Sequence, residues 1–77
     1  MRFAIKITHH PGTEHAKYTT SHEQNGTEEQ IAEWSDFLMK ALAEKKAIVL
    51  ELDNGSDLIL SPQIAQMSTF EIIRYRG

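Results

Sequence analysis

The sequence contains no cysteine among its 77 residues. This absence excludes disulfide bonds, thiolate zinc sites, iron–sulfur clusters and thiol nucleophiles. A chain of this length forms one domain, residues 1–77, and buries only about 60–65% of its unfolded surface. Its free energy of unfolding should therefore be modest, roughly 3–5 kcal/mol. A bound metal ion or self-association would be the available sources of extra stability.

The sequence also lacks an excess of positive charge, since its formal net charge is −3. Proteins that bind duplex DNA need a basic surface to neutralise phosphates, so this balance argues against them. No apolar run approaches the ~20 residues of a membrane-spanning helix. Lys6 interrupts the apolar residues that follow Met1, which argues against a secretory signal. We therefore expect a cytoplasmic protein without a membrane segment.

Residues 27–46 have the pattern of an amphipathic helix. Thr27 with Gln30 three residues later matches a capping box, and two glutamates occupy the first turn, where the helix dipole favours anions. Two lysines end the segment, where the dipole favours cations. The apolar residues share one arc, and we expect all of them in the core. They are Ile31, Trp34, Phe37, Leu38, Ala41 and Leu42.

Apolar residues at every second position predict the strands. These strands cover residues 2–8, 47–52, 58–60 and 69–76. Residues 14–21 either return as a second strand or form an extended loop. Ser61-Pro62 predicts one helical turn before the last strand, with serine as its cap. The predicted fold class is α+β, with a single amphipathic helix packed on a mostly antiparallel sheet of about four to five strands, the last three forming a meander.

The apolar pattern also predicts the register of the hairpin after the helix. A two-residue Asn-Gly loop would place Leu50 opposite Ile59, whereas a three-residue Asp-Asn-Gly loop places Leu50 opposite Leu58. A slip of one residue moves every side chain to the other face of the sheet, and only the second register keeps the leucines together. We therefore predict a type I turn followed by Gly55 at positive φ in a G1 bulge.

The second half of the chain combines an apolar strand, an Asn-Gly turn, a strand that ends in Ser-Pro, an isoleucine and a final apolar strand. These parts are Ala47–Leu52, Asn54-Gly55, Leu58–Leu60, Ser61-Pro62, Ile64 and Phe70–Ile73. With the preceding helix, they resemble a pattern among short bacterial and phage-borne proteins of unknown function. The resemblance covers about 30 of the 77 residues. It implies a small accessory protein without catalysis, of phage or mobile-element origin.

All four histidines lie within a stretch of fourteen residues, and Glu14 and Glu23 lie beside two of them. They are His9, His10, His15 and His22. Imidazole and carboxylate groups suit zinc, nickel or copper, so a metal-binding module is one alternative function. The spacing matches no known ligand signature. We expect a solvated polar loop that binds metal only adventitiously.

The sequence shows no arrangement typical of an active site. None of its serines lies in a Gly-x-Ser-x-Gly elbow, and its four glycines stand apart, so there is no glycine-rich phosphate loop. Glu51 and Asp57 flank the hairpin turn near water, where carboxylates serve solubility. We therefore predict a protein that is not an enzyme and needs no cofactor.

A second alternative is weak binding of single-stranded nucleic acid. Arg2 and Lys6 share the outer face of the first strand, while Arg74, Tyr75 and Arg76 end the last one. A basic and aromatic strip of this kind would suit single strands. Charges on outer and edge strands also deter strand-to-strand aggregation, which is the interpretation that we prefer.

One helix covers only one face of a sheet, and this leaves apolar residues uncovered. Val49 and Ile59 stand together on the opposite face, where an apolar pair of the last strand, such as Ile73 and Tyr75, would join them. Patches of this kind usually mark an interface, and symmetric dimers are the commonest assemblies. In the alternative, residues 14–21 or the chain ends cover this face. The predicted function is that of a non-catalytic accessory protein acting through a homodimer or an unidentified protein partner.

Overall fold

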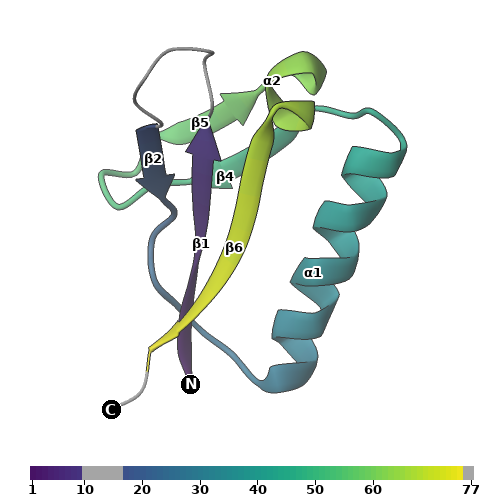
Figure 1. Ribbon diagram of the computed structural model, residues 1–77. Helices are drawn as coiled ribbons and strands as arrows, with labels where there is room; N and C mark the ends of the chain where they lie inside the picture. The colour runs from purple at the N-terminus through teal and green to yellow at the C-terminus, as the bar shows by residue number, and fades with distance from the viewer. Residues whose placement is uncertain (10–16, 76–77) are drawn as a thin grey trace.

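The computed structural model describes residues 1–9 and 17–75, and it confirms the predicted α+β fold class (Figure 1). Its strands are β1 (Arg2–His9), β2 (Lys17–Thr20), β3 (Gln24–Asn25), β4 (Ile48–Glu51), β5 (Asp57–Leu60) and β6 (Ser68–Tyr75). Its helices are α1 (Glu28–Ala43) and α2 (Pro62–Gln66). For the predicted segment 14–21, strand β2 confirms the strand and not the extended loop over residues 17–20, while residues 14–16 lie outside the described residues. No helix within the described ranges is long and apolar enough to cross a membrane.

Helix α1 begins where the sequence predicts. The side-chain oxygen of Thr27 accepts a hydrogen bond from the N–H of Gln30 at 3.2 Å, and the side chain of Gln30 accepts one from the N–H of Thr27 at 2.8 Å. This reciprocal capping box satisfies two N–H groups that would otherwise lack partners. The helix ends earlier than predicted, at Ala43, because Lys45 adopts a left-handed φ of 55°.

The strands form a four-stranded antiparallel sheet and a separate two-stranded hairpin. Strand β1 lies between β6 on one side and β2 followed by β3 on the other. The predicted meander is wrong, because β6 pairs with β1 and not with β5. Helix α2, capped by Ser61 as predicted, reverses the chain before β6. Strand β1 offers β6 an eight-residue ladder and sets Lys6 opposite Glu71, whereas β5 has only four residues.

The β4–β5 hairpin confirms the predicted register, with Leu50 opposite Leu58. The N–H of Gly55 donates to the carbonyl of Leu52 at 3.0 Å, and the N–H of Leu52 donates to the carbonyl of Ser56 at 2.8 Å. Gly55 has a φ of 80°, while the two residues before it have negative φ. This combination is a type I turn with a G1 bulge.

Gly55→Val should lower the free energy of unfolding by about 1 kcal/mol or more, because a β-branched residue resists positive φ. A Cβ atom at this position would meet no atom within 4 Å, so the cost would come from the backbone alone. Urea unfolding at 25 °C measures the change. Gly55→Asn is the control and should cost clearly less, since asparagine tolerates the left-handed region. An unchanged stability of the valine variant would contradict the prediction.

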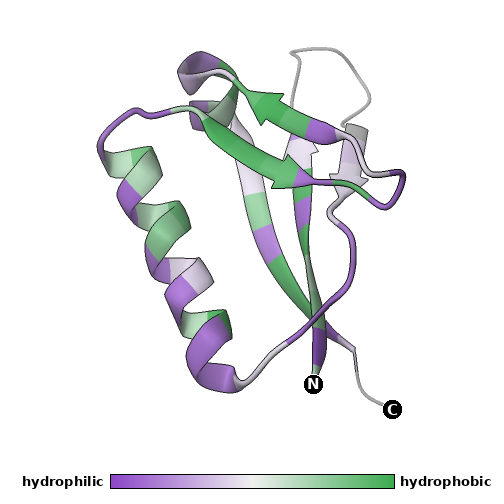
Figure 2. Cartoon of the chain, turned by 180° about the vertical axis from the view of Figure 1, so that it is seen from behind, coloured by the Kyte–Doolittle hydropathy of each residue, from purple (hydrophilic) through white to green (hydrophobic). Residues whose placement is uncertain are grey.

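The core lies between one face of the four-stranded sheet, helix α1 and the hairpin. Ile5 and Ile7 of β1 are buried together with Ile48, Leu50 and Leu60 of the hairpin. Figure 2 shows the hairpin passing over the sheet, with most of its two strands hydrophobic, and α1 running along the side. We call the covered side of the sheet its inner face. The opposite, outer face has no helix over it within the described structure.

Two residues predicted for the core take different positions. Phe37 is 48% exposed and Trp34 is half-buried, and their rings meet edge to face at 5.6 Å. The prediction of a buried Phe37 is therefore wrong. Phe37 lies at the flank of the apolar arc, and the narrow hairpin does not extend over that flank.

Candidate interaction surfaces

The structure describes two of the four histidines, His9 and His22, while His10 and His15 lie outside the described residues. The Nδ1 atom of His22 lies 3.2 Å from the carbonyl oxygen of Glu51, and the Nδ1 atom of His9 is buried. The two rings line different cavities. Within the described ranges, no group of three or more histidine, cysteine, aspartate or glutamate side chains is arranged to hold a metal ion. Adventitious metal binding by the whole segment stays a prediction.

The described residues of the basic strip predicted for single-stranded nucleic acid lie on two faces, and Arg76 lies outside the described residues. Arg2 forms an ion pair with Glu23 at 3.3 Å, and the Nζ atom of Lys6 lies 4.6 Å from the ring centre of Tyr18. Arg74 instead faces α1, where its guanidinium contacts the carboxylate of Glu28 at 3.1–3.3 Å. The prediction of one continuous strip is therefore wrong for Arg74, because neighbouring residues of a strand point to opposite faces.

An apolar surface covers the outside of the hairpin. Val49 and Ile59 lie directly opposite each other and are 51% and 68% exposed. Trp34 lines one hollow with Val49 and another with Phe37, which connects the hairpin to the flank of α1. We call Trp34, Phe37, Val49 and Ile59 the hairpin face. The sequence pattern places Trp34 and Phe37 in the core, so it does not predict that these two residues belong to the hairpin face.

The other two predicted interface residues, Ile73 and Tyr75, do not join this surface. They lie opposite Ala4 and Arg2 in the ladder, on the outer face of the four-stranded sheet. Val49 and Ile59 belong to the hairpin, whose inner side packs against the inner face of that sheet. The two pairs therefore lie on opposite sides of the molecule. The expectation of one shared face assumed that all these strands belong to a single sheet.

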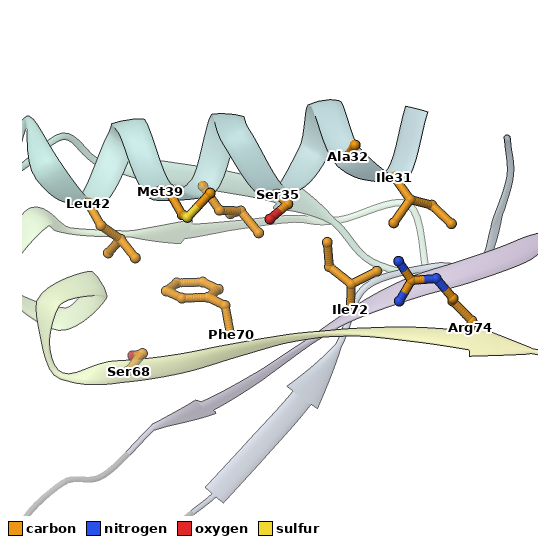
Figure 3. A pocket seen from close by; sticks show the side chains of 10 residues that line it. Ile31, Ala32, Ser35, Met39, Leu42, Ser68, Phe70, Ile72 and Arg74 are labelled. Carbon is orange, nitrogen blue, oxygen red and sulfur yellow. The ribbon is translucent and has the colours of Figure 1, made fainter. Parts of the chain in front are cut away.

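A groove separates helix α1 from strand β6 (Figure 3). It encloses about 540 Å³, within the range of ligand-binding cavities. We call it the β6 groove, and its walls are Ala32, Ser35 and Met39 of α1 and Phe70, Ile72 and Arg74 of β6. The side chains of Phe70 and Ile72 point toward the helix in Figure 3 and are only half-buried. Ala32 and Met39, which lie outside the apolar arc of the amphipathic helix α1, are the sequence signal that could have indicated this groove.

Strand β6 pairs on one edge only within the described part of the chain. Ile5 of β1 donates its N–H to the Oγ of Ser21 at 2.9 Å and accepts the N–H of Ser21 at 2.8 Å, so its backbone groups point away from β6. Ile72 lies opposite Ile5. In an antiparallel ladder, both residues of such a pair direct their N–H and C=O outward. The backbone groups of Ile72, and by alternation those of Phe70, therefore point to the unpaired edge.

Comparison with protein-family models, with curated proteins and with solved structures found no match to this chain. The resemblance of the second half to short bacterial and phage-borne proteins stays a prediction.

Proposed function

We propose that the protein is a non-catalytic interaction protein that self-associates through the hairpin face. The exposed pair of Val49 and Ile59 is the observation that carries the proposal. Large apolar side chains gathered on a surface usually mark an interface, and the rings of Trp34 and Phe37 extend this one. Aromatic residues are also enriched at the centres of interfaces.

A second copy is the partner that this surface suits best. A hairpin of two strands is marginally stable by itself, and here its outer side chains lack a covering layer within the described structure. A second hairpin packed face to face, about 10 Å away, would bury both apolar pairs. Such an arrangement is isologous, because a two-fold axis presents the same residues from both subunits. A chain of 77 residues buries a small fraction of its surface on folding, so the additional burial in a dimer would add appreciably to its stability.

Sedimentation velocity at tens of micromolar should give a dimer for the wild type. Ile59→Asp should raise the dimer dissociation constant at least about 700-fold, because burying an unpaired carboxylate costs about 2 kcal/mol or more in each subunit, or about 4 kcal/mol per dimer. Tyr18→Asp is a matched control, since Tyr18 is 67% exposed, almost as much as Ile59, but lies on the outer face of β2. It should leave the dimer intact.

Two results would contradict the proposal. The first is a monomeric mass for the wild type at these concentrations. The second is a dimer that Ile59→Asp leaves unchanged, or that Tyr18→Asp weakens equally, because the contact would then lie elsewhere on the molecule.

A further inference from the structure

The β6 groove is an independent candidate, on the other flank of α1 from the hairpin face. Met39, on its wall, is 59% exposed and lies two residues after Phe37. At 100° per residue, these two side chains point to nearly opposite sides of the helix. Seven of the ten residues that line the groove have apolar side chains, while Ser35, Ser68 and Arg74 contribute polar surface.

Three features of the groove point to an extended peptide as its occupant. The unpaired edge of β6 offers the N–H and C=O groups of Phe70 and Ile72, which another strand would satisfy. The side chains of the same two residues give the groove an apolar wall, which suits apolar residues at alternate positions of the added strand. Glu71, between these two residues, is an exposed acid on the outer face, where the other alternate residues of the added strand would lie beside it.

We propose that the β6 groove binds an extended, basic segment of another protein, which adds to β6 as a further strand. Apolar side chains of the segment would enter the groove at alternate positions, as in other cases of strand addition. Lysine or arginine between them would point to the outer face, beside Glu71. The net charge of −3 favours the approach of such a segment.

A second copy of this chain suits the same edge poorly. Pairing of β6 with β6 of a partner would place the two-fold axis about 2.4 Å from each strand, half of the strand spacing. Helix α1 lies beside β6 on the side away from β1 (Figure 1). The symmetry would bring the partner's α1 to the same joined edge, so that both helices would have to fit beside the paired strands. A single extended segment brings no helix of its own.

The test is a selection of displayed random heptapeptides on the full chain, followed by titration of the selected synthetic peptides into ¹⁵N-labelled protein. We expect enriched peptides with apolar residues at alternate positions and basic residues between them. On binding, the amides of Phe70 and Ile72 should become protected from hydrogen exchange. Those of Glu71 and Ile73, which face β1, should already exchange slowly in the free protein.

Two variants on one helix separate this proposal from the proposed self-association. Met39→Lys should weaken peptide binding at least tenfold and leave the sedimentation behaviour unchanged. Phe37→Lys, the matched control, should weaken the dimer and change the peptide affinity less than twofold. Circular dichroism checks that both variants keep their fold.

Four outcomes would overturn the proposal. Either no peptide is enriched, or the enriched peptides perturb amides away from β6, or Met39→Lys leaves their affinity unchanged. Protection of the amides of Phe70 and Ile72 that rises with protein concentration alone would also overturn it, because a second copy would then occupy the groove.

Discussion

Ile48→Ala should remove most of the free energy of unfolding of this protein. Ile48 is fully buried in the cluster that joins the hairpin to β1 and α1. Truncation of a buried isoleucine to alanine costs about 2–5 kcal/mol, through lost burial and the cavity left behind. A domain of 77 residues without disulfides has only about 3–5 kcal/mol in total. The variant should therefore be largely unfolded, or unfold at very low denaturant concentration.

Urea unfolding followed by the fluorescence of Trp34, the single tryptophan, measures this effect. Val49→Ala is the matched control, because Val49 is the next residue of β4 but is half exposed. Its free energy of unfolding is extrapolated to low protein concentration, which removes any contribution from self-association. Val49→Ala should then lower this free energy by about 0.5 kcal/mol or less. Similar losses in the two variants would show that the hairpin does not pack through Ile48.

Ser21→Ala should lower the free energy of unfolding by about 1–3 kcal/mol. Ser21 is a buried polar residue, and its Oγ accepts the N–H of Ile5, which is itself fully buried. Without this oxygen, the N–H of Ile5 loses its partner where water does not reach it, and an unsatisfied buried donor carries its full desolvation cost. A second bond, from the N–H of Ser21 to the carbonyl of Ile5, would persist because it involves only the backbone.

The same unfolding experiment measures the loss, and amide hydrogen exchange at Ile5 localises it. Thr19→Ala removes an exposed hydroxyl from the neighbouring strand β2 and should cost about 0.5 kcal/mol or less. If the Ser21→Ala variant were as stable as the wild type and the amide of Ile5 still exchanged slowly, another group would have to accept the hydrogen bond from this N–H.

Local sequence determined several features of this protein by itself. The start of α1 follows from Thr27 and Gln30, and the start of α2 follows from Ser61. The hairpin register follows from the three-residue turn at Gly55 and the leucines on either side of it. In each case the deciding interactions join residues only a few positions apart, so their free energies depend little on the remainder of the chain.

The tertiary structure alone decided which strands pair and which apolar residues stay exposed. Alternation shows that residues 69–76 form a strand, but it does not identify the partner, and the eight-residue ladder with β1 replaced the expected pairing with β5. That choice separated Ile73 and Tyr75 from Val49 and Ile59, and it placed an unpaired edge of β6 beside α1. The hydrophobic effect is non-directional and depends on the apolar area removed from water. The sequence pattern therefore predicts which faces are apolar but not which element covers each of them.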